Sequence, residues 1–139
     1  MSTKITGVKT LNNYIAKMKS HLKNPSSFFA KAGEVGRSNI TRHFYETKSP
    51  KGTWKKLKYR KGLPLNDNGV LRGSITYKSN NKSATIGTNE PYATIHNYGG
   101  MAGKGKKVKI PKREFMWLDK NAYKQMENAM IDTLEDLWV

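Results

Sequence analysis

The residues best suited to chemistry lie in a stretch rich in glycine and lysine. Gly100, Gly105 and Lys106 have the spacing of a phosphate-binding P-loop, in which backbone amides cradle phosphates and a lysine neutralises them. Such a loop also needs a Ser or Thr after the lysine, to hold magnesium, and a helix that begins there. Lys107 stands at the hydroxyl position, and Pro111 follows too soon for a helix of any length. The pattern therefore argues against nucleotide hydrolysis.

Histidines are the other candidates for acid-base or metal chemistry. His21, His43 and His96 lie on three separate predicted elements, without the spacing of a pair of metal ligands on one helix. The chain has no cysteine, so a thiolate metal site is also excluded. We expect no metal and no cofactor.

An acid-base cluster for RNA cleavage would need a proton shuttle beside a bound polyanion. His43 with Arg42 and Glu46 is one arrangement of this kind. The ordinary interpretation is a solvated helix face near the C-terminus of its helix, where cations are favoured. For His96 we expect a hydrogen bond that fixes the turn before the next glycines. No catalytic residue is assigned, and the chain is predicted not to be an enzyme.

Charge is divided unevenly along the chain. The 139 residues include 26 Lys and Arg against 10 Asp and Glu, a formal net charge of +16. Residues 48–113 hold 16 basic and 2 acidic side chains (+14), whereas residues 114–139 hold 2 and 6 (−4). The positive middle favours a polyanion or an acidic partner, and the asymmetry would let neighbouring copies attract head to tail. The alternative is that the charge only maintains solubility.

Two basic loops carry most of this positive charge. In the first, residues 47–64, lysines alternate with aromatic residues, and Trp54 is predicted to anchor the loop to the core. Stacking on single-stranded nucleic acid is the alternative role for its aromatic residues. The second, residues 99–109, has four Gly and four Lys and is expected to be mobile until a partner orders it. The residues predicted to contact DNA in a channel or an acidic partner are Lys51, Lys55, Lys56, Lys58, Arg60, Lys61, Lys104, Lys106, Lys107 and Lys109.

Helices at both ends of the chain are predicted to support these loops. Apolar residues at steps of three and four predict a helix over residues 8–22. Asn24 as N-cap and Pro25 as first helical residue predict a second helix that ends near Glu46. Its glycines share a face with phenylalanines, which indicates close packing of another element. Asp119 is predicted to cap a last amphipathic helix that runs to the C-terminal region.

Between the helices, apolar and polar residues alternate along the chain. A short helical turn after Gly69 is predicted to lead into a β-hairpin, with a two-residue turn at Asn80 and Asn81. Residues 92–98 are predicted to form one or two helical turns with Tyr92 and Ile95 against the sheet, and residues 108–110 a short strand. The fold class is therefore α+β, with N-terminal and C-terminal helices packed on a small, mainly antiparallel sheet that carries long basic loops.

Length and composition predict one domain over residues 1–139. Hydrophobic residues make up 36% of the chain, which is enough for a single core. The N-terminus lacks the apolar run of a signal peptide, and no stretch is long and apolar enough to cross a membrane. With no cysteine to form disulfides, a cytosol-like compartment fits.

Five short motifs follow one another in order. They are Pro50-x-Gly52-x-Trp54, Asn68-Gly69-x-Leu71-Arg72-x-Ser74-Ile75, Ile86-Gly87-Thr88, Tyr92-Ala93-x-Ile95-His96-x-x-Gly99-Gly100 and Ile110-Pro111-x-Arg113-x-Phe115. Their joint order and spacing resemble the phage virion morphogenesis family, also called tail completion proteins. The residues assigned to this structural motif are Trp54, Gly69, Leu71, Gly87, Tyr92, Ala93, His96, Gly99, Gly100, Pro111, Arg113 and Phe115. The chain departs from the family at Lys112, where a small residue is usual, and at Glu114, often proline.

The resemblance implies a structural protein of a tailed bacteriophage, without an enzymatic role. It would complete the tail or neck as a homo-oligomeric ring, with a hexamer favoured, around the DNA channel. Its partners would be other tail or neck proteins and DNA contacted independently of sequence, and it would be found in the virion after assembly in the host cytoplasm. The alternative is a free-standing nucleic-acid-binding protein without sequence preference, whose affinity would fall steeply with salt. A small ribonuclease ranks third.

Overall fold

The computed structural model describes residues 2–5, 25–58 and 61–137. The predicted helix over residues 8–22, its neighbour Asn24 and the loop residue Arg60 lie outside the described residues. The elements in chain order are β1 (Ser2–Ile5), α2 (Ser26–Glu46), β2 (Lys48–Ser49), β3 (Gly52–Thr53), α3 (Val70–Gly73), β4 (Thr76–Ser79), β5 (Ala84–Gly87), α4 (Ala93–Tyr98), β6 (Gly100–Ala102), a 3-10 turn (Lys104–Lys106), β7 (Val108–Ile110) and α5 (Lys120–Leu137). This arrangement confirms the α+β fold class.

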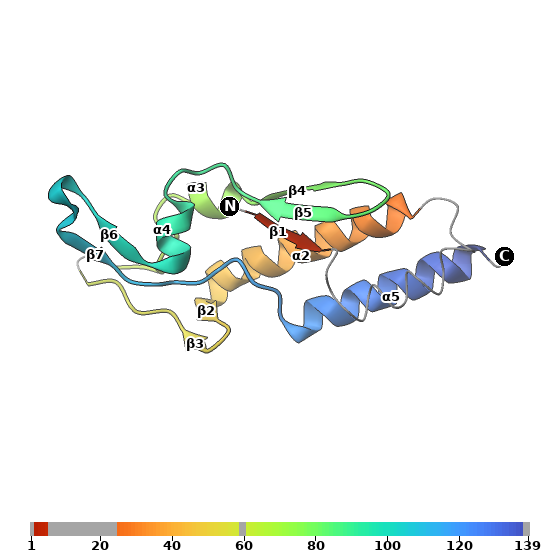
Figure 1. The fold of residues 1–139 in the computed structure, drawn as a ribbon. Coiled ribbons are helices and arrows are strands. Elements are labelled where there is room, and N and C mark those ends of the chain that lie inside the picture. Colours follow the sequence, from red (N-terminus) through yellow and green to blue (C-terminus); the bar gives the residue numbers. More distant parts are fainter. Residues whose placement is uncertain (1, 6–24, 59–60, 138–139) are drawn as a thin grey trace.

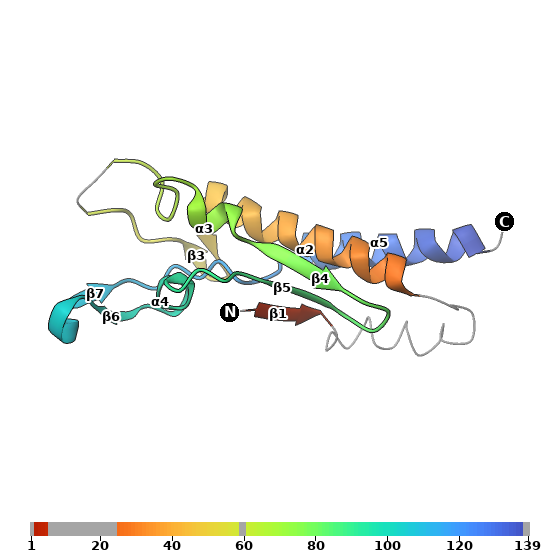
Figure 2. The same ribbon diagram turned by 90° about the horizontal axis from the view of Figure 1, so that it is seen from above.

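Helix α2 lies at the centre of the fold. A three-stranded antiparallel sheet of order β1-β5-β4 packs on one side of α2, and α5 packs along another side (Figures 1 and 2). The core gathers aromatic residues of α2, aliphatic residues of the sheet and methionines of α5. Its largest members with under 2% exposure include Phe28, Ile40, Phe44, Ile86, Phe115 and Met126.

The buried face of α2 is the one that the sequence predicts. Gly33 and Gly36 are buried in the same stripe as Phe29, Ile40 and Phe44. A Cβ atom added to Gly33 would lie 2.5 Å from the ring of Tyr77 on β4, so glycine here lets the sheet approach the helix. Pro25 precedes the first helical residue instead of being that residue, which moves the predicted start by one position. Helix α5 begins as predicted, because Asp119 Oδ1 accepts the amide of Ala122 at 2.9 Å.

The central hairpin differs from its prediction at the turn. Strands β4 and β5 pair with Ser79 opposite Ala84, so four residues connect them in place of two. The side chain of Asn80 accepts the amides of Lys82 (2.7 Å) and Ser83 (2.9 Å), which closes the turn without a left-handed asparagine. Strand β1, which no sequence signal predicted, pairs with the other edge of β5.

The glycine- and lysine-rich stretch is a β-hairpin and not the irregular loop that we expected. Strands β6 and β7 pair with Met101 opposite Lys109, and the hairpin extends from one end of the molecule (Figure 1). Gly103 and Gly105 have φ angles of 81° and 74°, which lets the chain reverse tightly. Val108 and Ile110 favour a strand because they are β-branched. We call this hairpin, residues 100–110, the arm.

Candidate nucleic-acid and partner interface

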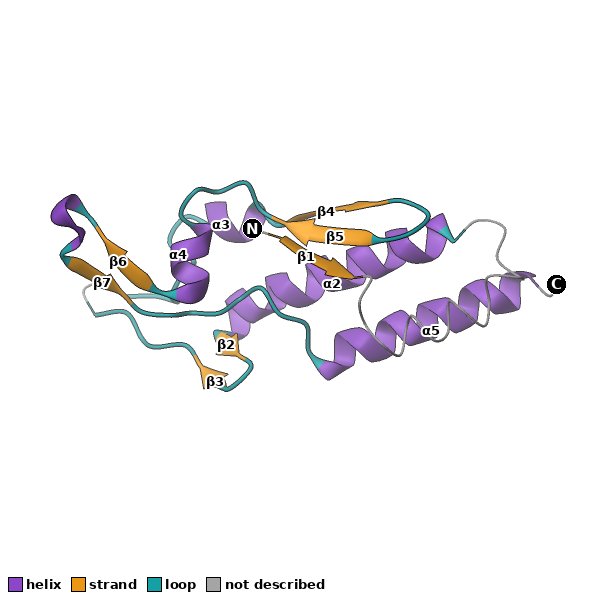
Figure 3. Ribbon diagram, viewed as in Figure 1, coloured by secondary structure: helices purple, strands orange, loops and turns teal. Residues whose placement is uncertain are grey.

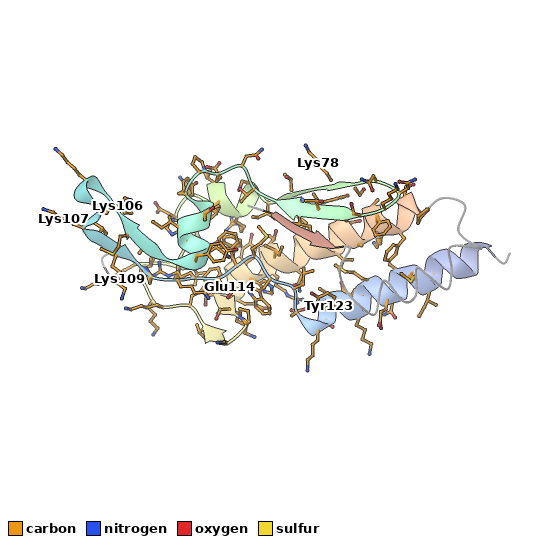
Figure 4. All side chains as sticks on the ribbon, viewed as in Figure 1. Lys78, Lys106, Lys107, Lys109, Glu114 and Tyr123 are labelled. Atoms are coloured by element: carbon orange, nitrogen blue, oxygen red, sulfur yellow. The ribbon has the colours of Figure 1, made fainter. Side chains whose placement is uncertain are left out.

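Two basic segments meet at the end of the molecule that carries the arm. Residues 54–58 run beside the arm and contain no helix or strand (Figure 3). Lys106, Lys107 and Lys109 lie toward the far end of the arm (Figure 4). Every predicted contact lysine that the structure describes is exposed. Lys51 lies apart from the others, in the small β2–β3 turn.

Trp54 holds the first basic segment against the core. Its ring is 4% exposed and meets the ring of Phe44 edge-on, with centroids 5.6 Å apart. Its Nε1 donates a hydrogen bond to the carbonyl of Glu114 at 2.9 Å. The anchor predicted from the sequence is therefore confirmed, and it ties the segment to the chain that returns from the arm.

Arg113 makes the second connection between the two segments. The guanidinium is buried, and its Nε and Nη2 donate to the carbonyls of Lys55 (2.8 Å) and Lys56 (3.3 Å). Its backbone amide donates to the carbonyl of His96 at 2.9 Å. One arginine thus joins the first basic loop, the return segment and α4, so its motif position has a structural reason.

Asn97 is a key residue that sequence reasoning missed. Its buried Oδ1 accepts the amides of Phe115 and Met116, each at 3.0 Å. Together with Ala93, Asn97 forms the buried face of α4, whereas Tyr92 is 39% exposed and Ile95 is half-buried. The prediction that Tyr92 packs against the sheet is therefore wrong. One sequence signal could have indicated this role. Asn97 is four positions after Ala93, so the two residues share a helix face, and Asn97 is a polar residue in a motif rich in apolar ones.

Gly99 lets the chain turn from α4 into the arm. Its φ is +75°, and an added Cβ would lie 2.9 Å from the backbone nitrogen of Lys112 and 3.1 Å from the carbonyl oxygen of Ile110. The amide of Gly99 donates a hydrogen bond to the carbonyl of Ile95 at 2.7 Å, and this bond closes the turn. The hydrogen bond expected from the His96 side chain is absent among the described residues, since its buried Nδ1 has no partner there. Burial, with the nearby charge of Arg113, lowers the pKa of His96.

Other residues of the structural motif lie at the ends of elements or in the core. Gly69 precedes α3 with a φ of +72°, and Leu71 in that helix is 4% exposed. Gly87 ends β5, where it pairs with both Thr76 and Ser2. These residues shape the body. The contacts with DNA or a partner that the sequence predicts for the basic residues stay predictions.

A groove of about 570 Å³ lies between the arm and the first basic segment. Leu57, Val108, Ile110 and Pro111 provide its apolar lining, and Arg113 lies with them. The remaining lining residues are Lys55, Lys56, Lys58 and Lys109. An apolar groove bordered by lysines suits a ligand with an apolar ridge and negative charge.

The sequence places His43 on a solvated helix face, but this prediction is wrong, because the structure buries the side chain. It is 1% exposed, its ring stacks on Trp117 with centroids 3.9 Å apart, and its Nε2 donates to the carbonyl of Trp117 at 3.1 Å. Burial is the main cause that lowers its pKa. A buried, stacked imidazole cannot reach a bound polyanion, so the ribonuclease interpretation loses the histidine of its proposed acid-base cluster.

Neither the P-loop pattern nor a metal centre finds support in the described residues. Strand β7 follows Lys107 where a P-loop would begin a helix. Within the ranges that the structure describes, no three His, Asp or Glu side chains come together to hold a metal ion. Helices of those ranges are also too short or too polar to span a bilayer.

A comparison with known protein families shows which family the chain belongs to. The sequence profile of the phage virion morphogenesis family matches residues 7–135. The chain belongs to this family. The description of the family connects its members with the morphogenesis of the phage virion.

One curated relative extends this result. The chain is 58% identical over 65 residues to the Mu-like prophage FluMu G protein 2 of Haemophilus influenzae, over 47% of each chain. The matched stretch thus spans about half the length of that relative. No solved structure matches the chain.

Proposed function

We propose that the protein completes the tail, or forms the neck, of a tailed bacteriophage as a ring around the DNA channel. Membership in the phage virion morphogenesis family supports a morphogenetic role, and the observation that carries the finer proposal is the basic arm end. A hexamer is the favoured ring, other tail or neck proteins are its partners, and it has no enzymatic role. Assembly takes place in the host cytoplasm.

The arm suits contact with DNA that does not depend on sequence. Lys104, Lys106 and Lys107 are exposed on the turn that joins β6 to β7. In a ring, these lysines would repeat around the axis and bind phosphates with release of counterions, without reading base edges. A conduit for a whole genome requires contact of this kind.

The proposal is tested in a phage that carries this gene. The gene is deleted from the phage genome, and a wild-type copy is then supplied from a plasmid. We expect the deletion to leave heads and tails unjoined or tails unfinished in electron micrographs, and the wild-type gene to restore infectious particles. Normal particles from the deletion strain would overturn the proposal. If the purified chain were then a monomer or dimer whose DNA affinity fell steeply with salt, the free-standing nucleic-acid-binding function would replace it.

A charge variant tests the DNA contact separately. Replacing Lys104, Lys106 and Lys107 by Ser should preserve the fold and the oligomer but reduce DNA retention and particle yield. The matched control replaces the exposed lysines Lys31, Lys78 and Lys82 by Ser, which removes the same charge from the body. Equal yields from the two variants would show that the arm lysines have no special contact with DNA.

A further inference from the structure

The groove beside the arm lacks a cover within the described chain. The arm has only two strands, and such a hairpin is marginally stable unless something packs on it. Pairing places Ala102 and Val108 on one face with Ile110, and Val108 is 54% exposed. This apolar face contributes to the groove, whose shape is fixed by the bonds of Arg113 to the neighbouring carbonyls. The groove is thus formed in advance, apolar in its lining and positive at its border.

Helix α5 carries a surface of complementary character. Tyr123, Glu127 and Ile131 are four residues apart and so form one stripe, in which Tyr123 is 36% and Ile131 49% exposed. From Glu127 to the end of the chain there are four acidic residues and no basic one. The last turn of α5 has no basic side chain to offset the negative end of the helix dipole. This helix half therefore favours a positive environment, which its own last turn does not provide.

The two surfaces lie apart on an elongated molecule, because the stripe begins at Tyr123 near the middle of the molecule, where α5 starts (Figure 4). The arm is at one end, and the C-terminal end of α5 is at the other, in both views (Figures 1 and 2). A helix of one copy can thus reach the groove of another copy but not its own. Contact between two different surfaces is heterologous, and repetition of it closes a ring when the rotation between copies permits.

We propose that the groove of one copy receives the Tyr123–Glu127–Ile131 stripe of α5 from the next copy. The inference rests on the proposed ring and adds the contact that builds it. Ile131 and Tyr123 occupy the apolar lining, and Glu127 lies against the lysines at the border. The arm turn with Lys104, Lys106 and Lys107 stays outside this contact and is left for DNA.

Two single variants and their mixture test the contact. Val108→Asp damages the groove and leaves the helix stripe intact, whereas Ile131→Lys does the reverse. Each alone should raise the dissociation constant of self-association about tenfold or more, as for loss of a buried anchor residue. Mixed together, the two variants retain one intact groove and one intact stripe, so light scattering should show a heterodimer and nothing larger. Absence of the heterodimer, with both variants still oligomeric, would overturn the proposal.

A second pair of experiments guards against a misfolded arm. Lys55→Glu with Lys56→Glu changes only exposed side chains and should weaken self-association similarly, with unchanged circular dichroism. Because the chain has no cysteine, Val108→Cys with Ile131→Cys should give a ladder of disulfide-linked oligomers under oxidation. Val108→Cys with Lys78→Cys on β4 is the control and should give none. An unchanged oligomer and no ladder would refute the contact.

The outcomes separate this inference from the proposed ring. If the wild-type chain forms a defined oligomer that all these variants leave intact, the ring stands and the groove contact falls. If the wild-type chain is monomeric at every concentration and the variant with Val108→Cys and Ile131→Cys gives no ladder, both fall. If the oligomer dissociates in the groove and stripe variants but persists in the triple arm-lysine variant, both stand.

Discussion

The body around α2 and the arm end are stabilised in different ways. In the body, α2 is covered by the sheet and by α5, and rings such as Phe28 and Phe44 are completely buried. At the arm end, few apolar side chains are covered, and polar contacts made by Arg113 and Asn97 hold the chain in place. Hydrophobic burial gives the body its stability, whereas hydrogen bonds give the arm its position and leave its apolar face and charge available for partners.

The largest effect should come from removing a ring in the body. Phe44→Ala removes a fully buried ring that contacts Trp54 and Phe115, and should lower the free energy of unfolding by about 3–5 kcal/mol. Val108→Ala in the arm should change it by at most about 0.5 kcal/mol, because this side chain is exposed. Urea unfolding of the monomer at low protein concentration measures both. Similar losses at the two positions would show that the arm belongs to the same cooperative core.

The next effect should come from the junction of α4 with the return segment. Asn97→Ala leaves two buried amides without an acceptor and should cost about 2–4 kcal/mol. Asn80→Ala is a matched control, since Asn80 also accepts two amides but is exposed to water that can replace it. We expect the control to lose about 1 kcal/mol or less in the same urea titration. A smaller loss at Asn97 than at Asn80 would contradict the role assigned to burial.

Glycine substitutions compare a crowded turn with an open one. Gly99→Ala forces a left-handed residue against the backbone of Lys112, so it should destabilise by about 2 kcal/mol and loosen the arm. Gly73→Ala adds a methyl group with nothing within 4 Å in a helical position, so stability should rise by about 0.5–1 kcal/mol. Thermal unfolding followed by circular dichroism distinguishes the two directions. A neutral Gly99→Ala would mean that the turn can relax.

The smallest predicted effect is a pH dependence located in the body. The pKa of His43 is lowered in the folded chain, chiefly by burial, so the unfolded chain binds a proton first as pH falls. Stability from this group is complete above the unfolded pKa near 6.5 and is lost as pH falls from there toward the folded pKa. Urea midpoints at pH 7.5 and 5.5 measure the loss, and His43→Gln should reduce the difference. An undiminished difference in that variant would assign the effect to other groups, His96 first.

Local chemistry allowed much of the body to be predicted. The apolar stripe of α2, the Asp119 cap of α5 and the anchor Trp54 each follow from residue type and spacing, and the structure confirms them. The two-residue turn was wrong, because the Asn80 side chain closes a longer turn. The arm was expected to be irregular, since its glycines suggest mobility until the pairing of Met101 with Lys109 is known.

Sequence alone determined the charge division, the absence of thiol chemistry and the motifs that indicate the family, because these depend on composition and short-range spacing. Tertiary structure alone decided that Asn97 holds the return segment, that His43 is buried on Trp117, and that the basic segments border one groove. Each of these contacts joins residues far apart in the chain. Burial and partner choice at such distances depend on how whole elements pack, and local propensity does not contain that information.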